Sequence, residues 1–250
     1  MKLSNSARLE SVFQKAFNIF KFVREEIGDY LFPKNCFGCC KEGEYLCSAC
    51  FNKVEYLNDL SCFLCHRTDI KNGVCLDCAR SSCIDQIAVA TAYTDNFVGR
   101  LVEGLKYDFV EQLSGPLANI MIEQINRQNM PETVKHSFIV PVPLYRKRLI
   151  ERGFNQAEAL AKLIAMKYDN QVEIRLLRRS KETAQQAKLS RSERKENVHG
   201  AFMVEARETM PETVILIDDV LTTGATFMEA AKCLKSAGVS KVICLAVCHG

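Results

Sequence analysis

The pattern of apolar positions after residue 84 alternates between two periods. Short apolar runs predict buried strands, and apolar residues spaced three or four positions apart predict helices. The predicted strands are 87–93, 138–142, 172–177, 214–217 and 242–247. The predicted helices are 97–107, 117–126, 155–168 and 227–235. Because strands and helices alternate, the pattern predicts an α/β fold in which a parallel sheet carries helices on both faces.

Residues 1–33 carry a different pattern. Apolar side chains recur there at helical spacing while charged residues such as Lys15 and Arg24 lie on other faces, which predicts an amphipathic helix. We expect this helix to pack on the rest of the protein; the alternative is a helix that binds a membrane surface or a partner. The start of the chain has no apolar core followed by a small-residue cleavage site. No stretch reaches the roughly 18 apolar residues of a membrane span, so we expect a cytoplasmic protein with no span.

Cysteines are concentrated between these two regions, because ten of the thirteen lie from Cys36 to Cys83. Most form C-x-x-C pairs. Two thiolates spaced in this way across a tight turn can share one metal ion, and two such pairs complete a closed tetrahedral zinc site. The predicted quartets are Cys36, Cys39, Cys47 and Cys50, and then Cys62, Cys65, Cys75 and Cys78. We therefore predict that residues 34–84 form a small double zinc ribbon with structural Zn²⁺, followed by the main domain at 85–250.

Other arrangements of the cysteines remain open. Disulfides or a redox pair fit an intracellular compartment less well than a metal site does. The pairs can also ligate zinc in a cross-braced order, in which the first and third pairs share one ion. Neither quartet needs Cys40, Cys83 or His66, and we expect these three to be spectators. Because the ribbon segment has few apolar residues, metal binding is expected to supply its folding energy.

The charge of the chain adds a second clustered feature. The net charge of +3 gives no bulk electrostatic argument for binding nucleic acid or membranes. The basic residues nevertheless gather at 146–152 and again at 175–195. Each cluster is either an ordinary solvated face or a binding surface for polyphosphate or nucleic acid.

The most specific candidate site is the segment 214–226. Four apolar residues predict a buried strand, Asp218 and Asp219 follow at its carboxyl end, and a turn containing Gly224 opens a helix. Free N–H groups at a helix N-terminus bind phosphate, and a glycine lets the backbone approach the ligand closely. Carboxylates instead accept hydrogen bonds from sugar hydroxyls. The segment therefore indicates a ribose 5-phosphate ligand; the alternative is an ordinary capped helix after a solvated acidic turn. Hydroxyl donors come from Thr222, Thr223 and Thr226.

The same segment resembles the 5-phosphoribosyl-1-diphosphate (PRPP) motif of type I phosphoribosyltransferases at every defining position. The resemblance implies that Asp218 and Asp219 hold the ribose 2′- and 3′-hydroxyls, with Asp219 as the catalytic residue. Mg²⁺, which prefers hard oxygen ligands, is expected to accompany PRPP and bridge its diphosphate and ribose hydroxyls. The resemblance assigns the 5′-phosphate to Thr222, Thr223, Gly224, Ala225 and Thr226.

PRPP requires a second anion site for its diphosphate. The predicted strand 138–142 ends in prolines and leads into the basic segment 145–156, where arginines offer a planar fork for phosphate oxygens. The alternative is a basic surface loop before a capped helix. Segment 178–202 is polar, basic and poor in aromatic residues, which is typical of a mobile loop rather than a packed element. In type I phosphoribosyltransferases such a loop closes over the site and excludes water.

The order of these features resembles the ComF family, which includes competence proteins that assist DNA uptake. The resemblance covers the chain from about residue 32 to about residue 247. It implies that Lys106, Arg148 and Arg152 contact the diphosphate. The segments that carry it are the cysteine ribbon, Leu105-Lys106-Tyr107, Pro141-Val142-Pro143-Leu144, Arg152-Gly153-Phe154-Asn155-Gln156 and the PRPP motif.

Two functions follow from the sequence. The first is an enzyme that binds Mg-PRPP and transfers the phosphoribosyl group to an unidentified acceptor. The second is a non-enzymatic protein that binds single-stranded DNA or a DNA-uptake helicase and uses the PRPP fold as a scaffold. Release of diphosphate from PRPP distinguishes the two.

Overall fold

The computed structural model describes residues 34–57, 61–68, 70, 72–93, 96–108, 110–182 and 191–250. The amphipathic helix predicted in residues 1–33 lies outside the described residues, and so do residues 183–190 of the predicted mobile loop. The chain forms two compact units that divide between Cys50 and Phe51. This division falls between the two predicted cysteine quartets.

The first unit is built around a turn rather than a packed core. Asn35 and Glu42 form an antiparallel bridge, and the turn between them carries the first two cysteines of the quartet. The short helix α2 (Ser48–Phe51) begins after Cys47 and ends at the division between the units. Among residues 34–50, the buried apolar residues are Leu46 and three cysteines. Apolar burial therefore contributes little to the stability of these residues.

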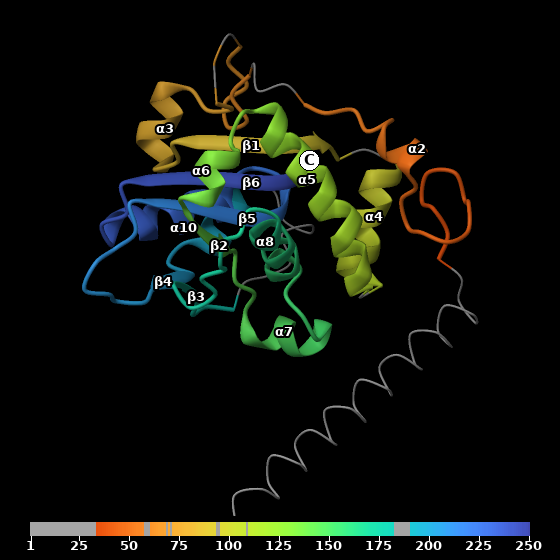
Figure 1. Ribbon diagram of the computed structural model, residues 1–250. Coiled ribbons are helices and arrows are strands. Elements are labelled where there is room, and N and C mark those ends of the chain that lie inside the picture. The colour runs from red at the N-terminus through yellow and green to blue at the C-terminus, as the bar shows by residue number, and fades with distance from the viewer. Residues whose placement is uncertain are drawn as a thin grey trace, which may run out of the picture. The chain divides into compact units, whose positions relative to one another are not determined.

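A four-stranded sheet organises the second unit, with its strands in the order β1-β6-β5-β2 (Figure 1). Each neighbouring pair of strands is parallel. The predicted α/β class with a parallel sheet is confirmed. The strands are β1 (Gln86–Ala92), β2 (Phe138–Pro141), β5 (Thr213–Leu221) and β6 (Lys241–His249).

The helices of the second unit connect these strands. Their positions match the four predicted helices to within a few residues and add several short ones. They are α3 (Leu76–Ser82), α4 (Phe97–Tyr107), the 3-10 turn η1 (Glu111–Leu113), α5 (Ser114–Arg127), α6 (Pro131–Lys135), α7 (Arg146–Arg152), α8 (Gln156–Lys167), α9 (Arg191–Val198) and α10 (Ala225–Ser236).

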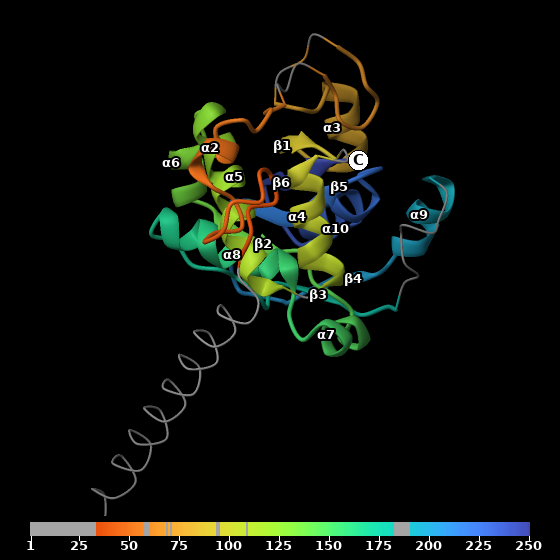
Figure 2. The same ribbon diagram turned by 90° about the vertical axis from the view of Figure 1, so that its right-hand side faces the viewer.

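Both faces of the sheet carry helices. Figure 2 shows α5 and α8 on one side of the strands and α10 on the other. Val214 and Leu216 of β5 pack in one cluster with Phe227 and Ala230 of α10. Because side chains alternate along a strand, Ile215 points to the opposite face, where it is also buried. An unbroken apolar run is what a strand covered on both sides requires.

Strand β5 is longer than the sequence predicts. The apolar run suggests an end at Ile217, but the strand continues through both acids to Leu221. Its neighbour β6 explains the difference, because Asp218 lies opposite Ala246 and Leu221 lies opposite His249 in the parallel ladder. The acids therefore lie within the last part of the strand rather than after it.

Two predictions about the region between β2 and β5 are wrong. Residues 172–177 do not form a strand: Val172 makes only an isolated bridge to Ile139, and residues 174–176 turn before β3 (Leu177–Arg179) begins. The segment 178–202 is not wholly a loop. It contains α9, and β3 pairs at its start in antiparallel fashion with β4 (Phe202–Val204) at its end. Buried Leu177 and Phe202 anchor this pairing, which composition alone does not reveal.

Local signals fix the helix ends nearest the candidate site. The Asn96 side chain accepts hydrogen bonds from two N–H groups at the start of α4. Asn155 caps α8 by accepting from the N–H of Ala157. The α10 helix ends at Ser236, two residues before Gly238, which has a positive φ of +106°. Across the part of the chain that the structure describes, no helix has the length and apolar character required to cross a membrane.

Candidate functional site

The two acids of β5 lie close together and are largely withdrawn from solvent. Asp219 is buried. The carboxylate of Asp218 turns back along the strand, where its Oδ1 accepts a hydrogen bond of 2.9 Å from the N–H of Asp219. Successive strand residues otherwise point to opposite faces, so this bond keeps the Asp218 carboxylate beside its neighbour.

A lysine from α4 supplies the counter-charge. Lys106 Nζ lies 3.1 Å from Asp219 Oδ1, and their side chains are 18% and 5% exposed. Burial lowers the pKa of Lys106, but the charges of Asp219 and Asp218 outweigh it and raise the pKa, so the ammonium stays charged. The structure thus brings together Lys106, which the sequence assigns to the diphosphate, and the acid pair. Losing one partner of such a buried pair costs about 3–5 kcal/mol.

One oxygen of the pair lacks a donor. Asp219 Oδ2 is buried and has no hydrogen-bond partner among the described residues. A buried acceptor without a donor costs free energy, and native structures contain few of them. Sugar hydroxyls and Mg²⁺-bound water are both donors of the kind this oxygen needs. This unsatisfied acceptor therefore fits a ribose with an accompanying magnesium ion.

The protonation of the pair responds to its surroundings. Burial and the charge of Asp219 raise the pKa of Asp218 to about 7, against the lowering influence of Lys106 and Arg179. Near neutral pH the pair therefore holds between one and two negative charges. Any ligand that brings a cation or hydrogen-bond donors favours the doubly ionised form.

The strand then passes directly into a loop and a helix N-terminus. Leu221 ends β5, and α10 begins at Ala225 after a left-handed Gly224 with φ +74°. The Gly224 carbonyl accepts the first backbone bond of the helix, 2.8 Å from the N–H of Met228. The predicted turn with one glycine opening a helix is confirmed. The N–H groups of a helix start have no partners within the helix, so this 12-residue helix offers donors at the loop.

Two of the three predicted diphosphate residues lie on α7, a short helix in the basic segment for which no helix was predicted. Leu149 and Ile150 are exposed, and no residue of α7 is buried. Arg148 belongs to this helix, and so does Arg152, whose Nη1 is buried without a hydrogen-bond partner among the described residues. After α7, Asn155 Nδ2 donates to the Val142 carbonyl at the end of β2, so the start of α8 is tied to the same edge of the sheet as the acids.

One site residue was missed by the sequence-based assignment. Arg179 at the end of β3 has its guanidinium 5.4 Å from the ring centroid of Phe202. Burial lowers the pKa of Arg179, the charge of Asp218 raises it, and that of Arg148 lowers it further, so both charged groups lie near enough to influence the guanidinium. In the sequence it is one of many basic residues at 175–195. Only the antiparallel pairing of β3 with β4 singles it out.

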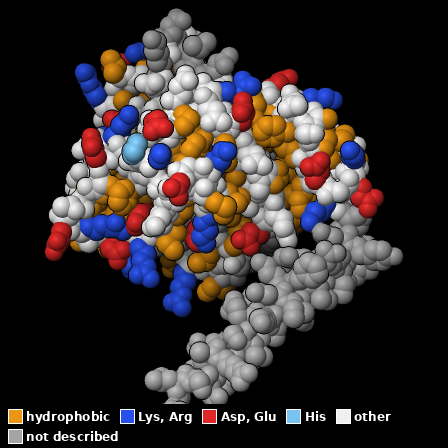
Figure 3. Space-filling view, in the orientation of Figure 1, with side chains coloured by type: hydrophobic (Ala, Val, Ile, Leu, Met, Phe, Trp, Pro, Cys, Tyr) orange, Lys and Arg blue, Asp and Glu red, His pale blue; other side chains and the backbone are white. Residues whose placement is uncertain are grey.

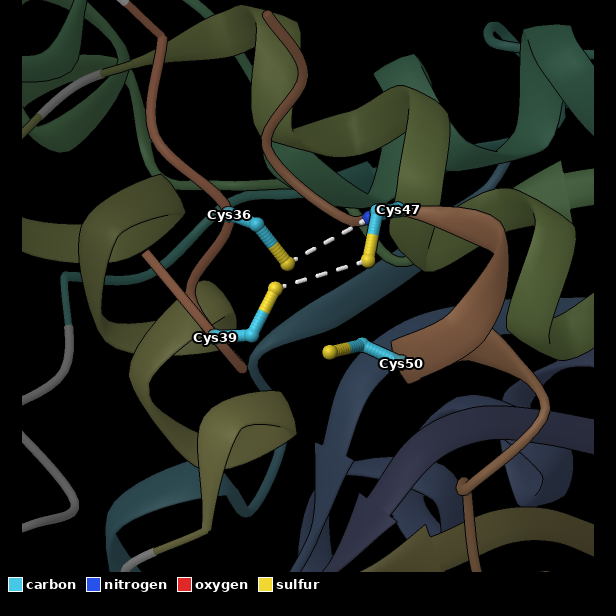
Figure 4. A group of neighbouring side chains, drawn as sticks. All are labelled: Cys36, Cys39, Cys47 and Cys50. Carbon is cyan, nitrogen blue, oxygen red and sulfur yellow. Dashed lines mark hydrogen bonds between the residues drawn. The ribbon is translucent and has the colours of Figure 1, made fainter. Parts of the chain in front are cut away.

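The cysteines form two groups of four, each with its sulfur atoms within 4.8 Å of one another. Figure 4 shows the first group, in which all four sulfur atoms converge on one point. Adjacent sulfur atoms lie 3.6 Å apart in the first group (Cys39 and Cys47) and 3.7 Å apart in the second (Cys65 and Cys75). Zinc bonded to sulfur at about 2.3 Å places tetrahedral ligands roughly 3.8 Å apart, so both groups fit zinc. The pairs combine sequentially rather than in a cross-braced order, and none of the eight forms a disulfide.

The two groups share one backbone design. In each, the N–H four residues after the first cysteine donates to that cysteine's carbonyl over 2.8 Å, and that residue is left-handed: Cys40 with φ 61° and His66 with φ 63°. Backbone N–H groups also stabilise the first thiolate. Burial alone raises the pKa of Cys36, but N–H donors from Cys47, Cys39 and Gly38 lower it to about 6. The same balance lowers the pKa of Cys62 to about 7. Cys40 and His66 complete the turns and belong to neither metal group.

The chain is similar in sequence to several known proteins. A model of the phosphoribosyl transferase domain matches residues 151–250. Competence protein ComFC of Streptococcus pneumoniae is 30% identical over 200 residues, which cover 79% of this chain and 84% of that protein. Competence protein ComFC of Bacillus subtilis is 29% identical over 218 residues, covering 79% and 81%. The DNA utilization protein YhgH of Escherichia coli K12 is 29% identical over 150 residues, covering 60% and 66%. The chain therefore belongs to the ComF family of proteins with a phosphoribosyltransferase domain.

Proposed function

We propose that this protein binds Mg-PRPP through residues 214–226 and acts in the cytoplasm in the uptake or use of DNA. One observation carries the proposal: Asp219 Oδ2 is buried without a hydrogen-bond donor, a few residues before a helix N-terminus that offers N–H groups. Acceptors at one end of the segment and donors at the other match the hydroxyls and the 5′-phosphate of one pentose. The names of the relatives, which refer to competence and DNA utilization, support the cellular role.

In the proposed complex, Asp218 and Asp219 accept hydrogen bonds from the ribose 2′- and 3′-hydroxyls. The negative charge of Asp219 then has a second effect. As diphosphate leaves, positive charge develops on the sugar ring, and a fixed carboxylate beside the ring stabilises it. We assign Asp219 the catalytic role for this reason. The acceptor of the phosphoribosyl group is identified only by its chemistry, a nucleophile that replaces diphosphate at the anomeric carbon.

The diphosphate end of the ligand is assigned to basic side chains around the acids. Lys106, Arg148 and Arg152 are the residues that the sequence suggests, and Arg179, whose pKa responds to both Asp218 and Arg148, adds a fourth. Lys106 is already 3.1 Å from Asp219, so its ammonium lies where ribose and diphosphate are proposed to meet. Mg²⁺ bound with PRPP supplies further positive charge to the diphosphate.

The test is a calorimetric titration of the full chain with Mg-PRPP. Replacing both acids (Asp218→Asn with Asp219→Asn) keeps the side-chain volume but removes the charges, and we expect at least a tenfold loss of affinity. Glu132→Gln is the matched control, because Glu132 is an exposed acid on α6 that lies 3.4 Å from His136 of the same helix. Equal affinity of the double variant and the wild type, with unchanged circular dichroism, contradicts the proposal.

A second function has its own support. Helix α7 carries Arg146, Lys147, Arg148 and Arg152 and buries no residue, which suits a surface that grips a nucleic-acid backbone. On the face drawn in Figure 3, basic and acidic side chains are interspersed, so this face carries no extended basic surface. Salt-sensitive binding of a labelled single-stranded oligonucleotide that survives Asp219→Asn, without diphosphate release from PRPP, favours a non-enzymatic DNA-binding role or a helicase partner over transfer.

A further inference from the structure

The two metal turns are alike in backbone but differ in what lies between their first two ligands. The first turn has Phe37 and Gly38 between its cysteines, and the second has Phe63 and Leu64. Phe37 lies beside Tyr45 of its own turn, with ring centroids 6.4 Å apart. Phe63 and Leu64 instead reach the strand ends and the loop of the candidate sugar-phosphate site. The second turn is therefore part of the wall of that site.

Leu64 lies directly against the glycine of the phosphate loop. A Cβ atom built on Gly224 would be 2.5 Å from Leu64 Cδ2, a distance that real Cβ atoms essentially never show. The leucine methyl therefore contacts the Gly224 backbone itself. The left-handed φ of +74° favours glycine at this position, and a side chain there would also require Leu64 to move. Leu64 therefore packs against the loop from the side of the cysteine turn.

Phe63 supports the strand ends that lead into the loop. Its ring is buried, and its centroid lies 5.2 Å from that of His249 at the end of β6. His249 pairs with Leu221, the last residue of β5 before the loop. Gly73 closes over the other side, where a Cβ would be 2.9 Å from the Phe63 ring and 2.1 Å from the Ile87 carbonyl. The aromatic ring is thus held between the second cysteine group and the sheet.

The metal site controls the position of both side chains. Phe63 and Leu64 are the only residues between the ligands Cys62 and Cys65, so their backbone follows the two sulfur atoms. The turn is closed by two bonds of 2.8 Å, from the N–H of Cys62 to Arg67 and from the N–H of His66 to Cys62. Zinc bonded to all four sulfur atoms would fix their separation, so its loss removes this constraint on the turn.

We propose that the second four-cysteine site is a positioning element of the phosphate loop. Its metal-held turn, through Leu64 and Phe63, keeps Gly224 and the N–H groups at the start of α10 in the arrangement that accepts a phosphate. Affinity for a sugar phosphate therefore depends on metal at the second site and not on metal at the first. This inference rests on the proposed PRPP function, and Leu64 is a positioning residue because it acts through the loop.

The first experiment compares matched ligand substitutions in the full chain. Cys39 and Cys65 are the second ligands of their groups, and both are exposed. We expect Cys39→Ser and Cys65→Ser each to release one zinc, measured by elemental analysis. Only Cys65→Ser should weaken the binding of ribose 5-phosphate and Mg-PRPP, by at least tenfold. Equal loss in both variants, or in neither, overturns the proposal.

The second experiment leaves both metal sites intact. Leu64→Ala removes the contact with Gly224, and Leu64→Met retains most of it; Leu76→Ala truncates an exposed leucine of α3 as the control. We expect Leu64→Ala to weaken ribose 5-phosphate and PRPP by the same factor, about five- to tenfold, with recovery in Leu64→Met. Arg148→Ala should weaken PRPP alone. A loss of PRPP affinity in Leu64→Ala that spares ribose 5-phosphate contradicts a role in the phosphate loop.

A ligand-free measurement separates the two proposals. Hydrogen exchange of peptides spanning 221–228 reports on the loop whether or not PRPP binds. We expect faster exchange there in Leu64→Ala and Cys65→Ser, and wild-type exchange in Cys39→Ser. If the wild type binds no PRPP but the exchange pattern holds, the PRPP function fails while the coupling stands. Wild-type exchange of the loop in Leu64→Ala overturns the coupling itself.

Discussion

The two cysteine groups of this protein show how one metal-binding turn can serve two different structural purposes. Both have the same C-x-x-C spacing, the same left-handed residue after the second ligand and the same sulfur separation. In the first group three of the four cysteines, with Leu46, are the buried apolar residues among residues 34–50. In the second, Cys62 and Cys75 share a cluster with the sheet and with α10. The cysteines therefore form most of the buried core of the first unit, whereas in the second unit they lie at the edge of a larger apolar core.

This difference lies in the neighbours of the cysteines rather than in the ligands. Burying a side chain such as Phe63 or Val74 contributes about 1.5–3 kcal/mol, and both belong to the large cluster of the second unit. Structural zinc contributes about 10–16 kcal/mol in small peptides. We infer that the first turn obtains nearly all of its stability from metal, and that the second obtains part of it from packing.

Metal removal should produce the largest difference between the two cysteine groups. With a strong chelator under reducing conditions, we expect complete loss of exchange protection in residues 34–50, because little else holds them together. Residues 61–78 should lose protection only in part, the 221–228 loop should exchange faster, and the rest of β5, β6 and α10 should keep their protection. Peptide-resolved hydrogen exchange measures all three regions in one sample. Equal loss in both cysteine groups would show that packing adds nothing to the second.

The contact between the second turn and the loop gives a smaller effect. Gly224→Ala places a side chain at φ +74° and against Leu64, so we expect destabilisation of about 2–3 kcal/mol in thermal or urea unfolding. Gly200→Ala is the matched control, because Gly200 has φ +64° with nothing within 4 Å of its built Cβ. It should cost only the backbone part, about 1 kcal/mol.

A double variant tests whether the contact with Leu64 causes the larger destabilisation expected for Gly224→Ala than for Gly200→Ala. Combining Gly224→Ala with Leu64→Ala removes the crowded methyl but leaves the backbone strain. We expect a coupling energy of about 1 kcal/mol, since the two residues are in contact. Strict additivity would mean that Leu64 moves aside without cost. In that case the turn and the loop are neighbours that do not constrain each other.

Features that depend on local spacing were predictable from the sequence. The two quartets need only residues within a few positions, and the buried run before Asp218 is continuous. Helix α7 was also predictable, because its residues are mostly good helix formers and Gly153, with φ +80°, ends it. The basic composition of this segment led to a prediction of ligand binding rather than of a helix.

Features that depend on distant partners were not predictable. The extension of β5 to Leu221 requires the parallel ladder with β6, and Arg179 becomes a site residue only because β3 pairs with β4. Lys106 meets Asp219 across more than a hundred residues of sequence. The contact between Leu64 and Gly224 joins two motifs that each looked complete on its own. Sequence spacing predicted parts of the candidate site, and tertiary pairing places Lys106 beside Asp219 and Leu64 beside Gly224.

The smallest expected effect distinguishes the two units by the sign of their pH dependence. Zinc ligands must be deprotonated, so the first unit should weaken as the pH falls. The Asp218 carboxyl acts in the opposite direction. Burial and Asp219 raise its pKa from 3.8 to about 7, so the folded form holds a proton that the unfolded chain has released between those values. Its contribution to stability is therefore complete below pH 4 and is lost as the pH rises toward 7.

Asp218→Asn isolates this contribution, because an amide imitates the protonated carboxyl at every pH. We expect similar free energies of unfolding below about pH 4, an advantage for the variant that grows as the pH rises, and a further rise of that advantage by about 1–2 kcal/mol between pH 6 and pH 8. Urea unfolding, monitored by hydrogen exchange in β5, measures this difference in free energy. Because β5 lies in the second unit, the measurement excludes the zinc-dependent first unit. Parallel pH profiles for the two proteins would mean that Asp218 is ionised throughout this range. The acid pair would then be doubly charged without a ligand, and its need for an incoming cation or sugar would be greater.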